Sequence, residues 1–210
     1  MQNIENIIFD YGNVIFMIDF ARAHKAFTDL GIKDVAKIFA HTEQNALFDD
    51  FDMGKITAAQ FRDGIRDITG KSHLTDEQIN DAWNSLLIGV PPGRHELLLQ
   101  VKSRYNTFLL SNNNEIHYRY IMDYLKKEHA LEDNKGFFIK DYYSHLLGMR
   151  KPNADIFDYV LQTHQLIPER TLFIDDSPQH LVTAERLGIQ TALLTAPDTL
   201  EELLKRKNLI

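Results

Sequence analysis

An apolar run of strand length, Ile7–Phe9, ends directly in the carboxylate of Asp10 and a turn that contains Gly12. In open α/β sheets, ligands bind in the crevice beyond the carboxyl ends of the strands. A carboxylate at that place can act as a nucleophile or as a metal ligand. Because aspartate is also a common turn residue, Asp10 indicates chemistry only if other functional residues reach the same edge.

Two further segments offer groups that could bind a phosphate. Ser111 and Asn112 follow an apolar run and precede a helical pattern, so they could bind a phosphate together with the amides of a helix N-terminus. The alternative is that these residues cap the helix. Lys151 precedes Pro152, which favours an extended backbone at the start of a helix. From there its ammonium group could neutralise a phosphate and a neighbouring carboxylate.

Two adjacent carboxylates, Asp175 and Asp176, follow another apolar run. Adjacent acids repel each other unless a cation is present. Mg²⁺ prefers one or two carboxylates together with water and substrate phosphate oxygens. The alternative is an exposed loop in which Asp175 or Ser177 caps the next helix. We favour metal binding, because the pair follows a strand at the edge where Asp10 is also expected.

The elements that must position these residues alternate between strands and helices. We expect strands at Ile7–Phe9, Thr107–Leu110, 141–144, Leu172–Ile174 and Thr191–Leu194. We expect helices at Ile116–Lys126, Ala154–His164, Pro178–Leu187 and Thr199–Lys207. Such alternation predicts an α/β fold, with a Rossmann-like parallel sheet flanked by helices. Right-handed crossovers would bring the carboxyl ends of all the strands to one edge.

The interval from about Asp19 to Val90 shows helical patterns and no convincing strand. Capping boxes begin at Thr57 and Thr75. Breaks fall at glycines and at a proline pair: Gly31, Gly54, Gly70 and Pro91-Pro92-Gly93. We interpret residues 18–88 as an all-helical cap inserted into a core of residues 1–17 and 89–210. An independent helical domain is the alternative, but the first strand needs the later strands as partners.

Composition narrows the class of protein. The 210 residues are 44% hydrophobic and 25% charged, with a formal net charge of -7, which disfavours a nucleic-acid surface. The absence of cysteine excludes disulfides and thiolate chemistry. No segment has the pattern of a signal peptide or the length of a membrane span. We therefore expect a cytoplasmic protein that binds neither nucleic acid nor membrane, and nothing indicates an obligate protein partner.

The order and content of the four segments resemble the motifs of the haloacid dehalogenase-like hydrolase superfamily. The resemblance runs from Asp10 to Asp176 and includes the position of the helical insertion. Within the superfamily, three stretches are most similar to bacterial sugar phosphatases, notably the α-D-glucose-1-phosphate phosphatase type. They are Phe9-Asp10-Tyr11-Gly12-Asn13-Val14, Gly54-Lys55-Ile56-Thr57 and Gly148-Met149-Arg150-Lys151-Pro152.

The resemblance implies a Mg²⁺-dependent phosphatase that hydrolyses a small phosphorylated metabolite, such as a sugar 1-phosphate. Asp10 would be the nucleophile and would form an aspartyl phosphate. The implied Mg²⁺ ligands are the Asp10 carboxylate, the Gly12 carbonyl and Asp176, with Asp175 as an outer or alternative ligand. The implied phosphate-binding residues are Ser111, Asn112 and Lys151. The cap would exclude water and select the leaving group.

Gly12 departs from the family pattern, because an aspartate at this position usually protonates the leaving oxygen. General acid–base catalysis contributes about 10²–10⁴-fold, so the loss should be felt. The substrate could have a better leaving group, the enzyme could be weak, or another acid could come from the cap or from Asp19, His41 or His180. We expect His180 to lie on a helix surface rather than to be catalytic.

Two other functions remain open from the sequence. A 2-haloacid dehalogenase uses the same aspartate nucleophile without a metal, but the pair Asp175 and Asp176 has no use in that reaction. A metabolite-binding or regulatory protein on the same fold is the second alternative. Several cap residues could face the site, although we expect each in the helical core or on the surface: Asp49, Asp50, Asp52, Met53, Lys55 and Trp83.

Overall fold

A five-stranded parallel sheet forms the centre of the protein. The computed structural model describes residues 4–38 and 46–210. The strand order is β5-β4-β1-β6-β7, and the strands are β1 (Asn6–Phe9), β4 (Asn106–Ser111), β5 (Lys140–Tyr143), β6 (Thr171–Asp175) and β7 (Gln190–Leu193). The predicted α/β class with a parallel sheet is confirmed.

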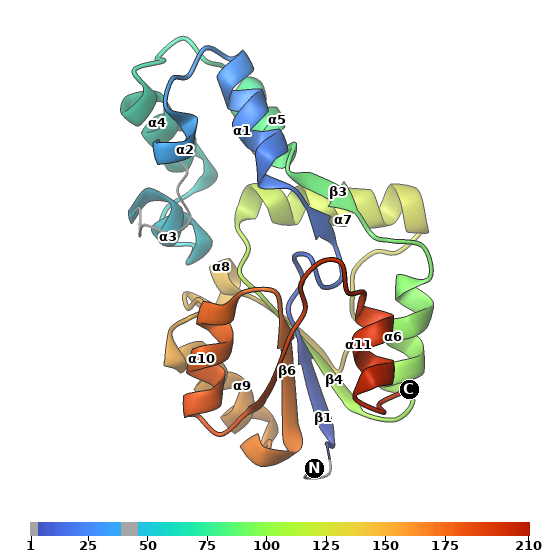
Figure 1. Ribbon diagram of the computed structural model, residues 1–210. Coiled ribbons are helices and arrows are strands. Elements are labelled where there is room, and N and C mark those ends of the chain that lie inside the picture. The colour runs from blue at the N-terminus through green and yellow to red at the C-terminus, as the bar shows by residue number, and fades with distance from the viewer. Residues whose placement is uncertain (1–3, 39–45) are drawn as a thin grey trace.

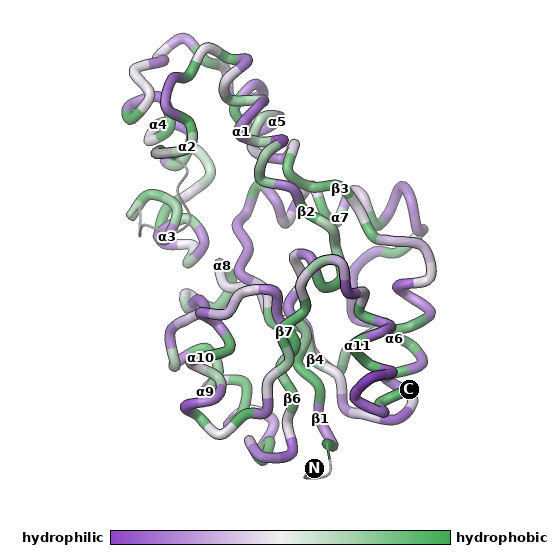
Figure 2. Tube along the Cα trace, viewed as in Figure 1, coloured by the Kyte–Doolittle hydropathy of each residue, from purple (hydrophilic) through white to green (hydrophobic). Residues whose placement is uncertain are grey.

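Apolar residues on both faces of the sheet explain its place in the core. In β1, Ile8 packs with helices α9 (Ala154–His164) and α10 (Pro178–Arg186). Its neighbours Ile7 and Phe9 point to the opposite face, because side chains alternate along a strand. Helices α6 (Arg94–Lys102), α7 (Glu115–His129) and α11 (Leu200–Arg206) contribute to that second core. Figure 1 shows α9 and α10 on one side of the sheet and α6 and α11 on the other, and Figure 2 shows that β1 is largely hydrophobic.

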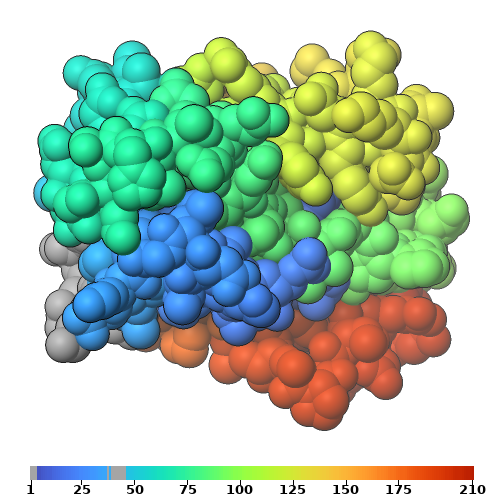
Figure 3. Space-filling model, turned by 90° about the horizontal axis from the view of Figure 1, so that it is seen from above, coloured from blue at the N-terminus to red at the C-terminus, as the bar shows by residue number. Residues whose placement is uncertain are grey.

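The expected helical insertion follows β1. It contains α1 (Phe20–Asp29), α2 (Val35–Ile38), α3 (Ala46–Asp52), α4 (Ala58–Thr69) and α5 (Asp76–Asn84). The capping boxes predicted at Thr57 and Thr75 are both present. Aromatic side chains form the core of the insert, with Phe51 stacked on Phe61 at 4.2 Å between ring centroids. Seen from above, the insert residues gather on one side of the molecule (Figure 3).

Our prediction that no strand lies between Asp19 and Val90 was wrong. Strand β3 (Leu87–Gly89) pairs antiparallel with β2 (Met17–Ile18), and together they connect the insert to the sheet domain. Strands of three and two residues are too short to show an alternating pattern, and the pairing depends on contacts between distant segments. The sequence analysis also missed α6. Two short elements complete the fold, helix α8 (Ser144–Leu147) and the 3-10 turn η1 (Pro168–Arg170).

The carboxyl ends of the strands point toward the insert (Figure 1). Phe9 of β1 lies in register with Leu109 of β4 and with Ile174 of β6. The residues that follow these three strands therefore meet at one edge beneath the insert. Within the part of the chain that the structure describes, no helix is both long and apolar enough to span a bilayer.

Candidate active site

Lys151 is the electrostatic centre of the site. Its side chain is fully buried, and its Nζ donates to Asp10 Oδ1 at 2.5 Å and to Asp175 Oδ2 at 2.8 Å. A buried ammonium is stable only when it is paired and hydrogen-bonded in this way. The two carboxylates raise the pKa of Lys151 above its usual value, against the effect of burial, so the side chain stays charged.

Asn112 fixes the backbone of Lys151. The Lys151 amide donates to Asn112 Oδ1 at 2.9 Å, and Asn112 Nδ2 donates to the Lys151 carbonyl at 2.8 Å. The Asn112 side chain thus positions the backbone of Lys151. Ser111, at the end of β4, lines the cavity beside it. Neither Ser111 nor Asn112 caps α7, because the cap is Asn114, whose side chain accepts from the His117 amide at the start of that helix.

Three carboxylates lie within reach of a single metal ion. One oxygen each of Asp10, Asp175 and Asp176 lies within 4.8 Å of the others. Burial raises the pKa of Asp10 to about 7, although Lys151 opposes the shift. Burial also raises the pKa of Asp176, which accepts a hydrogen bond of 2.9 Å from Asn13. The charge of Lys151 does not fully offset the cost of burying Asp10 and Asp176. A divalent cation that prefers oxygen ligands, such as Mg²⁺, fits this set of carboxylates.

Asp175 has a different environment from Asp176. It is fully buried and accepts hydrogen bonds from Lys151 and from the Ser177 amide, the latter at 2.7 Å. His180 Nδ1 lies 2.9 Å from its Oδ2. Although burial acts in the opposite direction, the charge of Lys151 and the contact with His180 hold the pKa of Asp175 below its usual value. Its oxygens are already occupied, so Asp175 is suited to positioning Lys151.

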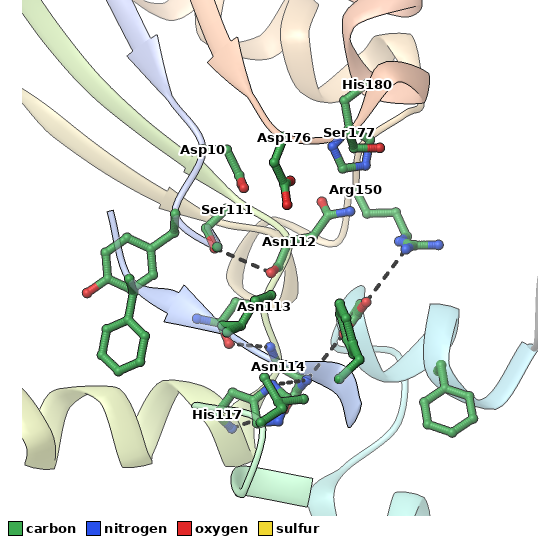
Figure 4. A pocket seen from close by; sticks show the side chains of 18 of the residues that line it. Asp10, Ser111, Asn112, Asn113, Asn114, His117, Arg150, Asp176, Ser177 and His180 are labelled. Carbon is green, nitrogen blue, oxygen red and sulfur yellow. Dashed lines mark hydrogen bonds and ion pairs between the residues drawn. The ribbon is translucent and has the colours of Figure 1, made fainter. Parts of the chain in front are cut away.

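The expectation that His180 lies on a helix surface was wrong. It is the third residue of α10, its side chain is only 17% exposed, and it lines the cavity beside Asp176 (Figure 4). Helix α10 begins at Pro178, after only two residues beyond β6, so its first turn keeps this residue near the end of the strand. Burial lowers the pKa of His180.

The cavity above these residues has a volume of about 520 Å³. Asp10, Ser111 and Asp176 lie together at one end (Figure 4), Gly12 also lines the cavity, and the insert contributes part of the lining. Its apolar wall includes Phe16, Ile18, Phe48, Trp83 and Leu87. The lining also has a polar band that consists of Asp49, Asp52 and Arg150.

Three of the six cap residues named from the sequence line this cavity: Asp49, Asp52 and Trp83. The expectation of core or surface placement was wrong for Asp49 and Asp52, whereas Trp83 is buried in the core as expected and also contributes to the cavity lining. Asp50 and Lys55 instead form a partly exposed ion pair of 3.5 Å. The sequence analysis did not identify Arg150 as a cavity residue. Its place next to Lys151 was the available signal, since both follow the same turn.

Gly12 occupies the position at which an aspartate usually protonates the leaving oxygen in the family. A Cβ atom built there would lie 3.0 Å from Ile18 Cδ1 and 3.8 Å from Asp10 Oδ2. Of the candidate replacements, the Asp19 side chain accepts from the Ala21 amide and caps α1, away from the cavity lining. His41 lies outside the described residues. His180 does line the cavity, but its Nδ1 is engaged with a buried carboxylate.

The sequence was compared with models of protein families and with characterised proteins. A family model described as haloacid dehalogenase-like hydrolase matches residues 4–188. A curated relative, D-ribitol-5-phosphate phosphatase of Bacteroides thetaiotaomicron, is 31% identical over 191 residues, which cover 90% of each protein.

Solved structures are similar over almost the whole chain. A haloacid dehalogenase family enzyme from Bacteroides thetaiotaomicron, crystallised with magnesium and inorganic phosphate, is 33% identical with a TM-score of 0.83, covering 96% of this chain and 99% of that one. A predicted hydrolase of the same family from Porphyromonas gingivalis is 30% identical with a TM-score of 0.83, covering 98% of both chains.

Proposed function

Because the chain belongs to the haloacid dehalogenase-like hydrolase family, we propose that it is a Mg²⁺-dependent phosphatase acting on the phosphate monoester of a small sugar or sugar alcohol. The observation that supports this most directly is the arrangement of Lys151 between Asp10 and Asp175, with Asp176 beside them. It offers a carboxylate nucleophile, a buried cation and a metal-binding acid at one end of the cavity. The similar haloacid dehalogenase family enzyme from Bacteroides thetaiotaomicron that was crystallised with magnesium and inorganic phosphate supports Mg²⁺ as the cofactor.

In the first step, an oxygen of Asp10 attacks the phosphorus and forms a new P–O bond, while the bond from phosphorus to the leaving oxygen breaks. The leaving oxygen takes up a proton from solvent, and the attacking water returns one to solvent in the second step. Water then attacks the phosphorus of the aspartyl phosphate, which releases inorganic phosphate and restores the Asp10 carboxylate. Lys151 favours the ionised form of Asp10 against the effect of burial and offsets the charge of the phosphate.

A bound Mg²⁺ supplies electrostatic stabilisation of the phosphoryl oxygens. Asp10, Asp176 and the carbonyl of Gly12 would hold it, since Gly12 lines the cavity beside both acids. Asp175 is the positioning residue for Lys151. Ser111 and the backbone of Asn112 would bind phosphate oxygens at the end of β4.

Two substrate types fit the proposal. The name of the curated relative supports a sugar-alcohol phosphate such as ribitol 5-phosphate. The absence of an acid at Gly12 favours instead a sugar 1-phosphate, because an anomeric oxygen is a better leaving group than a primary alkoxide. The motif resemblance to α-D-glucose-1-phosphate phosphatases supports this second candidate.

The test is hydrolysis of p-nitrophenyl phosphate, ribitol 5-phosphate, glucose 1-phosphate and glucose 6-phosphate, each with Mg²⁺ or with EDTA. We expect turnover with Mg²⁺, its loss with EDTA, and its loss in Asp10→Asn. Turnover of chloroacetate without metal would instead support the dehalogenase reaction. Failure to hydrolyse any of the four esters would contradict the phosphatase and favour a binding protein.

A further inference from the structure

A charged band crosses the cavity above the phosphate end and joins the insert to the sheet domain. Arg150 lies in the loop before Lys151 and forms an ion pair with Asp49 of helix α3 (Figure 4). One of its terminal nitrogens lies 3.6 Å from Asp52 Oδ2, one turn farther along the same helix. All three side chains line the cavity and are about one fifth exposed.

The band has fixed geometry. Asn114 Nδ2 donates to Asp52 Oδ1 at 3.3 Å, and Ser144 Oγ donates to the Asp52 carbonyl at 2.6 Å. These contacts hold the end of α3 against the ends of β4 and β5. The carboxylates are therefore placed before a ligand binds, which reduces the entropy lost on binding.

The band has two negative charges and one positive charge. Arg150 is the only lysine or arginine among the described residues that line the cavity, and both of its carboxylate partners line it as well. A second anionic group on a substrate would meet net negative charge here, in a site where burial strengthens electrostatic interactions. Repulsion of this kind is a common way to reject a wrong ligand.

Hydroxyl groups fit the same band. Carboxylate oxygens only accept hydrogen bonds, and each has more lone pairs than the protein contacts use. Arg150 Nε is buried and has no hydrogen-bond partner within the described chain. Phe48 and Trp83 lie on the apolar part of the lining, where they can contact C–H groups. An uncharged chain of several hydroxyl groups matches this combination.

We infer that Asp49, Asp52 and Arg150 form a binding site for an uncharged polyhydroxyl leaving group and reject phosphate esters with a second anionic group. The inference rests on the proposed phosphatase function and specifies its substrate class. The hydroxyl groups of the leaving group donate to the two carboxylates, and the aromatic wall contacts its carbon chain.

The test compares kcat/KM for three esters: ribitol 5-phosphate, 6-phosphogluconate, which adds a carboxylate, and p-nitrophenyl phosphate, which has no hydroxyl groups. The variants are Asp49→Asn and Asp52→Asn. The matched control is Asp50→Asn, which removes a carboxylate from the same helix outside the cavity lining. Thermal unfolding of each variant measures its folding separately.

We expect the native protein to prefer ribitol 5-phosphate over 6-phosphogluconate by about tenfold or more. Each of the two variants should lower the ratio of kcat/KM for ribitol 5-phosphate to that for p-nitrophenyl phosphate by about tenfold. Each should also narrow the discrimination against 6-phosphogluconate, while Asp50→Asn behaves as the native protein.

An equal loss on all three esters would show that the band only holds the insert in place, and would overturn the inference. The inference would also be overturned if the native protein did not discriminate against 6-phosphogluconate. The same holds if this discrimination were unchanged in both Asp49→Asn and Asp52→Asn. Failure of the underlying function looks different, because the native protein would then hydrolyse none of the esters.

Discussion

Replacing Gly12 with aspartate should restore a general acid to the cavity. The Cβ atom would lie 3.8 Å from Asp10 Oδ2, so the new carboxyl group can reach an oxygen leaving the phosphorus near Asp10. The backbone at Gly12 is not in the left-handed region, so a side chain is permitted there. The one close neighbour is Ile18 Cδ1 at 3.0 Å, the tip of a flexible side chain. Ile18→Val removes that atom and gives a second background for the test.

The expected gain depends on the leaving group. General acid catalysis contributes about 10²–10⁴-fold, equivalent to about 3–5 kcal/mol of transition-state stabilisation. A primary alkoxide needs the proton, whereas p-nitrophenolate leaves without one. We therefore expect Gly12→Asp to raise kcat for ribitol 5-phosphate by about tenfold or more and to leave the rate with p-nitrophenyl phosphate nearly unchanged.

The matched control is Gly12→Asn, which has the same shape but no acidic proton. Rates would be measured with saturating Mg²⁺ in both the native and the Ile18→Val backgrounds. Equal acceleration of the two esters, or the same gain from asparagine, would refute the argument that proton donation limits the native enzyme. An unchanged rate in both backgrounds would show that another group already supplies the proton.

Three further predictions concern stability. Lys151→Met leaves two buried carboxylates without their cation, so urea unfolding should show a loss of about 3–5 kcal/mol at neutral pH; an unchanged midpoint would contradict the pairing. Mg²⁺ at 100 times its Kd should stabilise the native protein by about 2.7 kcal/mol, measured as a thermal shift, and Asp176→Asn should lose this effect. Burial raises the pKa of Asp52 from 3.8 to about 6. The stability that Asp52 contributes in its protonated form is therefore fully present below the unfolded pKa of 3.8 and is lost as pH rises through the folded pKa of about 6. Asp52→Asn should therefore be more stable than the native protein near about pH 8, by up to about 3 kcal/mol, with the difference disappearing toward about pH 4; a constant difference would contradict this.

Local signals in the sequence were sufficient to predict the sheet. They were also sufficient to predict that the residues after its strands lie together at one edge. The apolar runs at β1, β4 and β6 are buried between two layers of helices, and such strands are continuous and easy to find. The predicted helix Ala154–His164 matches α9 at both ends. Parallel order alone then brings the residues after these strands to one edge.

What the sequence could not provide depends on contacts between distant segments. The hydrogen bonds between Asn112 and the Lys151 backbone join residues 39 positions apart, and the pair of Arg150 and Asp49 spans 101 positions. Neither residue type indicates such a partner, because asparagine usually caps helices and arginine is usually solvated. His180 was misplaced for the same reason: its orientation depends on how α10 leaves the sheet.

The two ends of the cavity therefore differ in the charge of the ligand group that they favour. At the phosphate end, Asp10 and Asp176 are carboxylates whose burial raises their pKa, and added positive charge from a metal ion improves their environment. At the insert end, Asp49 and Asp52 exceed the charge of Arg150, and no phosphate is expected there. A substrate with one phosphate and one uncharged hydroxylated end satisfies both regions in a single orientation. The reverse orientation would place a phosphate against the two carboxylates of α3, so the charge distribution selects the productive binding mode as well as the substrate.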